Sequence, residues 1–143
     1  MNEVRVTAQL LLPQSYLSVA LCTSLDARFL SVASLLDPRQ QLLVPLQPSR
    51  RTAAGIALST RTGRWTSLTW ALAWGCDALP ESARIRFSSG TLRFRSSVDS
   101  ALHWLDGSCW VAEAAGDHAL ATLVVRDVDV STVALSDRIT RGH

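Results

Sequence analysis

The sequence predicts a β-rich α+β domain, in which three hairpins build a mostly antiparallel sheet and two helices pack on it. Several short runs alternate apolar and polar residues and are separated by turn-forming residues, which is the pattern of strands and hairpins. Two other segments space their apolar residues as a helix does. An all-β sandwich or barrel is the alternative, if the first of these two segments is a strand.

Length and composition favour one globular domain over residues 1–143. The chain is 48% hydrophobic and 18% charged, which is typical of a protein with a large core or a buried contact surface. No apolar run approaches the length of a membrane-spanning helix, and Pro13 and Leu21 do not suit a signal peptide. We therefore expect a protein of the cytoplasm or of a virion, with no membrane partner.

The first third of the chain is expected to contain a strand pair followed by a helix. Residues 4–12 alternate in period two up to Pro13, and residues 16–22 are their expected partner strand. The next segment, 25–36, has four apolar residues at helical spacing: Leu25, Phe29, Val32 and Leu36. A short strand and a Pro- and Arg-rich loop, expected to be a flexible linker, complete this part at residues 40–51.

Three of the five tryptophans, Trp65, Trp70 and Trp74, lie in one predicted hairpin. The large apolar residues around them all have even numbers. They can share one face of the hairpin only if the numbers of directly opposed residues add up to an even number, so that even-numbered residues oppose one another. A three-residue loop, Arg61–Gly63, meets this condition and places Gly63 at the left-handed position of such loops. Trp70 and Trp74 are then predicted to lie in the core or in a subunit contact, whereas Trp65 faces the other way as a candidate for surface recognition.

A second predicted hairpin, residues 84–95, carries four arginines on the face opposite its apolar residues: Arg84, Arg86, Arg93 and Arg95. Like charges opposite each other on paired strands are destabilising, so this face needs a negatively charged complement. Asp127 and Asp129 have the same two-residue spacing and could supply it as an ion-pair ladder. An acidic protein partner and the phosphates of a nucleic acid are the other candidates, and we rank nucleic acid below the first two.

Residues 97–107 are predicted to form the second helix, with Ser97 as its N-cap and Gly107 at its end. This helix would place three titratable residues on one polar face: Asp99, His103 and Asp106. Two carboxylates beside an imidazole could act as a general base or as a weak metal site. The same spacing is common on exposed helix faces, so catalysis is the lesser interpretation, and we predict neither a metal nor a cofactor.

The last third is expected to be a hairpin over residues 109–130, followed by a frayed tail at 136–143. The hairpin would turn near Gly116 and Asp117. The three cysteines are widely spaced and lack a CxxC motif: Cys22, Cys76 and Cys109. This pattern predicts reduced thiols, with neither a zinc site nor a disulfide framework.

These features predict a non-enzymatic assembly or interaction protein that forms a homo-oligomer or binds an acidic protein partner. The sequence has no recognisable catalytic or cofactor motif, and its apolar strands offer surface that an oligomer could bury. All fourteen basic residues are Arg, as in proteins of GC-rich bacteria and their phages, so a small structural component of a phage particle is one candidate. The alternatives are a nucleic-acid-binding module that uses the four arginines and a small enzyme that uses His103 and Asp99.

Overall fold

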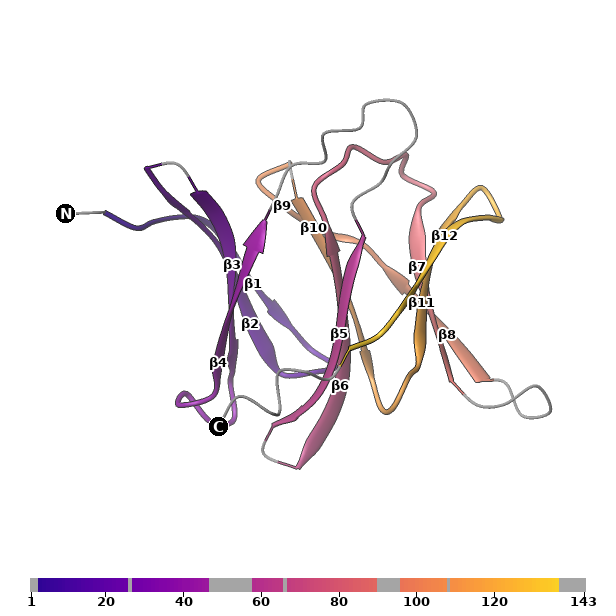
Figure 1. Ribbon diagram of the computed structural model, residues 1–143, viewed down its shortest axis with the longest axis horizontal. Coiled ribbons are helices and arrows are strands. Elements are labelled where there is room, and N and C mark those ends of the chain that lie inside the picture. Colours follow the sequence, from indigo (N-terminus) through magenta and orange to yellow (C-terminus); the bar gives the residue numbers. More distant parts are fainter. Residues whose placement is uncertain are drawn as a thin grey trace.

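The computed structural model describes residues 3–25, 27–46, 58–65, 67–89, 96–107 and 109–136. Every element of regular secondary structure assigned in these ranges is a strand. The twelve strands form three antiparallel sheets of four strands each. The sheets stack as three layers (Figure 1). The expected α+β class with two helices is therefore wrong, and the all-β alternative, a sandwich of sheets, describes the chain.

The first sheet is a meander in which each strand pairs with the next one along the chain. Its strands are β1 (Arg5–Leu12), β2 (Leu17–Ser24), β3 (Ala27–Ser34) and β4 (Gln41–Leu46). Strands β1 and β2 confirm the predicted strand pair, and β4 confirms the short strand expected after it. Residues 47–57, which include most of the expected linker, lie outside the described residues.

The middle and third sheets are interleaved along the chain. The middle sheet has the order β5-β6-β10-β9 and contains β5 (Ser59–Trp65), β6 (Leu68–Gly75), β9 (His103–Leu105) and β10 (Cys109–Ala115). The third sheet has the order β12-β11-β7-β8 and contains β7 (Arg84–Ser89), β8 (Ser96–Ala101), β11 (Leu120–Val125) and β12 (Val128–Ala134). The chain therefore passes from the middle sheet to the third after β6 and again after β10.

Both faces of the middle sheet are buried, because it lies between the other two sheets (Figure 1). On β6, the large residues Trp70, Leu72 and Trp74 pack with the first sheet, whereas the small residues Ala71 and Ala73 pack with the third. Trp70 is 0% exposed and Trp74 is 6% exposed. The prediction that these two tryptophans share one core face is therefore confirmed.

The helix expected at residues 25–36 is wrong, because strand β3 occupies most of this segment. Leu30 and Val32 face the middle sheet and are 0% exposed, while Phe29 lies on the other face and is half-buried. Phe29 and Val32 are three residues apart, which is a helical spacing, but they lie on opposite faces of the strand. The helical pattern arises because both faces of β3 carry apolar residues. Leu25 is 80% exposed in the turn before β3.

The helix expected at residues 97–107 is also wrong, because its residues belong to two strands in different sheets. Strand β8 pairs with β7 in the third sheet, and β9 pairs with β10 in the middle sheet. The apolar residue Val98 is 42% exposed on β8, whereas Ser100 is buried and donates a hydrogen bond to the carbonyl of Glu113, at 2.6 Å. Backbone pairing at both ends of the segment overrides its helical pattern.

The predicted loop of the tryptophan hairpin is wrong as well. Trp65 pairs with Leu68, so the chain reverses direction between these two residues, and odd-numbered residues of β5 oppose even-numbered residues of β6. Trp65 therefore shares a face with Trp70, against which its ring packs edge to face at a centroid distance of 5.4 Å. At 8% exposure Trp65 is a core residue, so the expected role in surface recognition is wrong.

Gly63 owes its place to close packing rather than to a turn. It lies opposite Trp70 on β5, and a Cβ atom added there would lie 2.8 Å from Cζ2 of the Trp70 ring. The sequence-based expectation placed this glycine in the loop because a three-residue loop with glycine at its left-handed position matched the expected register. The tight turn instead uses Ser67, which has a positive φ of 63°.

The other two predicted hairpins differ from the structure in their partners. Strand β10 belongs to the middle sheet and β11 to the third, so the hairpin expected over residues 109–130 is wrong. Strand β7 pairs with β8, and residues 90–95 lie outside the described residues. In the predicted tail, Ser136 forms an isolated parallel bridge with Arg61, and residues 137–143 lie outside the described residues.

A buried carboxylate ties the first sheet to the middle sheet. Glu113 of β10 is 1% exposed. It accepts hydrogen bonds from the backbone N–H groups of Gln14 and Ser15, both at 2.8 Å, and from the Ser15 hydroxyl at 2.5 Å. These donors belong to the turn between β1 and β2, so Glu113 fixes that turn against β10.

Within the described residues, no helix has the length and apolar character needed to cross a membrane.

We expect Gly63→Ala to lower the free energy of unfolding by about 1–3 kcal/mol, because the added methyl group overlaps the fixed ring of Trp70. Urea unfolding monitored by tryptophan fluorescence measures this loss. Ser59→Ala, at an exposed position on the same strand, is the control and should change stability by less than about 0.5 kcal/mol. Equal stability of the two variants would contradict the assigned register.

We expect Glu113→Gln to lower the free energy of unfolding by about 2–4 kcal/mol, because the amide NH₂ group would face backbone donors that now bind a carboxylate. Chemical denaturation measures the change. Glu81→Gln, at an exposed site, is the matched control and should be neutral. A loss at Glu113 no larger than that at Glu81 would show that the tie contributes nothing to stability.

Candidate functional site

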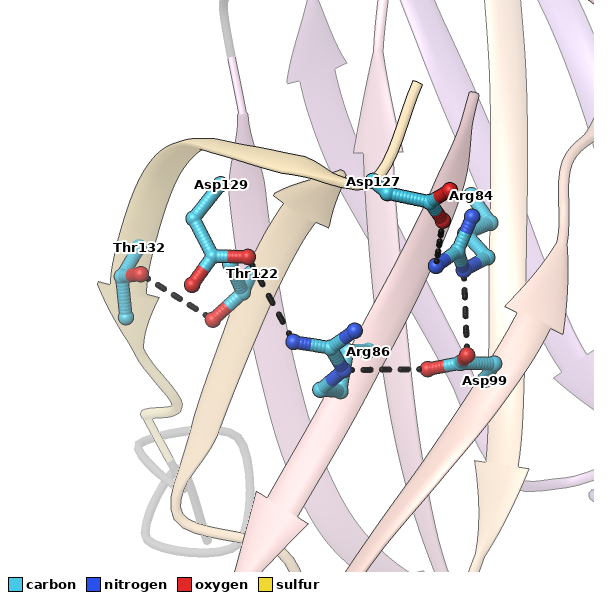
Figure 2. Close-up of polar contacts among 7 residues, drawn as sticks. All are labelled: Arg84, Arg86, Asp99, Thr122, Asp127, Asp129 and Thr132. Carbon is cyan, nitrogen blue, oxygen red and sulfur yellow. Dashed lines mark hydrogen bonds and ion pairs between the residues drawn. The ribbon is translucent and has the colours of Figure 1, made fainter. Parts of the chain in front are cut away.

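The first candidate surface is the outer face of the third sheet, where β7 presents two of the predicted arginines. Ile85 and Phe87 of this strand are 0% exposed and pack toward the middle sheet. Arg84 and Arg86 alternate with them and therefore project from the opposite face (Figure 2). We call Arg84, Arg86, Asp99, Asp127 and Asp129 the charged face.

Each arginine of the charged face contacts two carboxylates (Figure 2). Arg84 binds Asp99 through Nε at 3.0 Å and Asp127 through Nη2 at 2.9 Å. Arg86 binds the other oxygen of Asp99 through Nε at 3.2 Å, and Asp129 through Nη1 at 3.4 Å. Asp99 therefore bridges both guanidinium groups and links β8 to β7.

The ion pairs resolve the repulsion expected between neighbouring arginines. Of the three candidate complements, the structure contains the internal one: Arg84 pairs with Asp127, and Arg86 pairs with Asp129. Hydrogen bonds from Arg84 to Asp127, and then to Asp99, raise the pKa of the Arg84 guanidinium above its usual value. With two guanidinium groups and three carboxylates, the charged face carries one excess negative charge when all five groups are ionised.

The network surrounds a shallow hollow lined by Arg86, Ser88, Ser97, Asp99, Leu120, Thr122, Asp129 and Thr132. Within it the hydroxyl groups of Thr122 and Thr132 are hydrogen bonded to each other at 3.0 Å (Figure 2). Five polar side chains of the hollow are thus paired across strands β7, β8, β11 and β12: Arg86, Asp99, Thr122, Asp129 and Thr132. Among the described residues, no three His, Cys, Asp or Glu side chains gather as metal ligands.

The residues predicted as an acid–base or metal group are not brought together as expected. Asp99 lies on β8 of the third sheet, and His103 lies on β9 of the middle sheet. Asp106 follows β9 and lies 3.9 Å from Nη2 of Arg28 on β3. The shared face was an inference from helical spacing, and it is wrong because the segment is not a helix.

The role of Asp99 in the charged face was missed for the same reason. The sequence around Asp99 has helical spacing, which predicts a neighbour four residues away, His103, rather than one on the adjacent strand. The remaining predicted binding residues, Arg93 and Arg95, lie outside the described residues.

The second candidate surface is the outer face of the first sheet, and it was not predicted. Pairing across β1–β4 places twelve residues on this face: Val6, Cys22, Phe29, Pro45, Gln9, Ala20, Ser31, Leu43, Leu11, Ser18, Ala33 and Gln41. None of the twelve is charged. We call these residues the uncharged face.

Both glutamines of the uncharged face are already hydrogen bonded to neighbours on the same face. Gln9 donates to the Ser18 hydroxyl at 3.1 Å, and Gln41 donates to the Ser31 hydroxyl at 2.9 Å. Large apolar side chains lie exposed beside them, with Leu11 at 61%. The face is thus apolar in part, and each glutamine forms one side-chain hydrogen bond within it.

A sequence signal for the uncharged face exists. Residues 5–46, which span the four strands, contain five charged residues: Arg5, Asp26, Arg28, Asp37 and Arg39. Arg5 begins β1 and lies in the same row across the sheet as Arg28. Arg28 points toward the middle sheet, where it contacts Cys109, and Asp37 and Arg39 lie in the loop between β3 and β4. A charge-poor segment of four strands indicates a sheet without a charged outer face, but the helix expected at 25–36 concealed it.

We expect Asp99→Asn to lower the melting temperature by about 2–5 °C, because one change weakens contacts to both arginines at a partly exposed site. Asp127→Asn is the matched control, because Asp127 is 87% exposed and contacts Arg84 alone in this network, so its effect should be smaller. Scanning calorimetry measures both, and added salt at about 1 M should reduce the difference. Equal melting temperatures would contradict the bridging role of Asp99.

No protein-family model matches the chain, and no match was found among the curated proteins or among the solved structures. The function proposed below therefore rests on the geometry of the two faces.

Proposed function

We propose that the protein is a non-enzymatic assembly protein that associates with a second copy of itself through the uncharged face. The observation that carries this proposal is the complete lack of charge at twelve neighbouring outward positions on one sheet. Solvent-exposed faces of antiparallel sheets commonly carry charged side chains, and these also discourage association. A flat face without them can be dehydrated at little cost.

A second copy is the partner that suits this face best. In a two-fold contact the same patch meets itself, so a charge near the axis would meet a like charge. An uncharged face avoids this repulsion. Exposed apolar side chains at its margins supply the burial that drives association, with Val6 at 55% and Leu43 at 58% exposure.

The size of the uncharged face predicts reversible association. Four strands at about 4.8 Å spacing and three rows of outward residues give roughly 400 Å² of flat area before side-chain relief is counted. A stable interface buries about 800 Å² on each partner. We therefore propose a dimer that dissociates on the order of micromolar concentration, or one contact within a larger assembly.

We further propose that the protein is a small structural component of a phage particle, located in the cytoplasm or in a virion. Such a component would use the uncharged face to contact its neighbours. The charged face offers less support for an acidic partner or for nucleic acid, because Arg84 and Arg86 are already paired with three carboxylates. Phosphate groups would have to displace these contacts.

Sedimentation velocity over roughly 1–200 µM tests the proposal on the full chain. The wild-type protein should shift from monomer toward dimer as concentration rises. Leu11→Glu combined with Leu43→Glu places charges at both margins of the uncharged face, and we expect it to weaken association by about tenfold or more.

The matched control carries Val98→Glu and Val128→Glu on the third sheet, where the two side chains are 42% and 62% exposed. It adds the same charge to the protein and should associate like the wild type. A wild-type protein that remains monomeric at the highest concentration would overturn the proposal. So would equal weakening by both double variants, since association would then depend on net charge.

A further inference from the structure

Two cysteines that are far apart in the sequence meet at one end of the middle sheet. Gly75 pairs with Trp110 across β6 and β10, so Cys76 and Cys109 occupy the next opposed position. Their sulfur atoms lie 3.1 Å apart. Directly opposed residues of antiparallel strands have Cα separations of about 4.5–5.5 Å, which lies within the range that a disulfide spans.

We propose that Cys76 and Cys109 form a redox-active dithiol, which hydrogen peroxide or a hydroperoxide of similar size converts reversibly into a disulfide. Contact between the sulfurs and the opposed backbone positions carry this inference, because oxidation then needs little movement of either strand. The inference is independent of the proposed self-association.

The surroundings of the two sulfurs assign them different roles. Nη2 of Arg28 donates a hydrogen bond to the Cys109 sulfur at 3.5 Å, so a positive charge lies beside that atom. Burial, and then the hydrogen bond and charge of Cys109, raise the pKa of the Cys76 thiol to about 12. Because the guanidinium group of Arg28 contacts the Cys109 sulfur, we assign Cys109 as the sulfur that attacks the oxidant and Cys76 as the sulfur that closes the disulfide.

The reaction proceeds in two balanced steps. The Cys109 thiolate attacks one peroxide oxygen, the O–O bond breaks, and the departing hydroxide takes a proton, which leaves a sulfenic acid and one water. The Cys76 sulfur then attacks the sulfur of the sulfenic acid, and its proton leaves with the hydroxyl group as a second water. Two thiols lose two electrons in total, and one peroxide gains them.

Access to the pair comes from the side of Cys76. Cys76, directly after β6, is partly exposed, whereas Cys109, whose sulfur it contacts, is 1% exposed. A peroxide molecule is scarcely larger than water and can approach where a bulky disulfide reagent cannot. This difference predicts selectivity for small oxidants.

The disulfide would also close a long segment of chain. Strands β7, β8 and β9 lie between the two cysteines, so the bond would enclose two strands of the third sheet and one of the middle sheet. Closing such a loop restricts the unfolded chain. We therefore expect the oxidised protein to melt at a higher temperature than the reduced protein.

The wild-type protein, folded and in full length, is treated with hydrogen peroxide and then denatured and alkylated. The expected result is that alkylated thiols fall from three to one, that a Cys76–Cys109 linked peptide appears in the mass map, and that dithiothreitol restores all three. Three free thiols after treatment, or a link through Cys22, would overturn the proposal.

Single variants test the assigned roles. Cys76→Ser should retain a sulfenic acid on Cys109, which dimedone traps, whereas Cys109→Ser should leave Cys76 unreacted under the same conditions. Cys22→Ser is the control and should form the disulfide like the wild type. A dimedone adduct on Cys76 in the Cys109→Ser variant, formed at the rate of the wild-type reaction, would refute the order of attack.

Discussion

The middle sheet is covered on both faces, and this constraint determines which residues its strands can carry. A strand buried on both faces cannot alternate apolar with polar residues, so β6 alternates large with small residues instead. Its tryptophans fill the space toward the first sheet, and its alanines let Ile85 and Phe87 of the third sheet approach closely. Gly63 follows from the same requirement, since the ring of Trp70 occupies the space where a side chain would lie.

The buried carboxylate between the first two sheets and the charged side chains on the outer face of the third sheet are paired with neighbouring groups. Inside, Glu113 is acceptable because three donors of one turn surround it. Outside, the two exposed faces differ: the third sheet carries a network of ion pairs, whereas the uncharged face of the first sheet has no charged residue. The molecule therefore has a charged outer face on the third sheet and an uncharged outer face on the first sheet. This difference between the two faces is the basis of the proposed assembly.

Local patterns predicted which residues face inward, but seldom which strands are partners. The alternation in β1 and β2 and the shared face of Trp70 and Trp74 could be inferred, because each depends on period two alone. The ladder from Arg84 and Arg86 to Asp127 and Asp129 could be inferred from matching spacings. Glu113 with Ser15, and Cys76 with Cys109, join segments 98 and 33 residues apart, and no local pattern encodes such pairings.

The interleaving of the middle and third sheets has a consequence for how the chain acquires its fold. The first sheet uses only pairings between successive strands, so it can form as soon as residues 5–46 are available. The middle sheet has to wait for β10, and until then β6 exposes an unpaired edge and two apolar faces. During synthesis the completed first sheet can cover the tryptophan face of β6. The first sheet would then keep these apolar side chains out of water until β10 has been made.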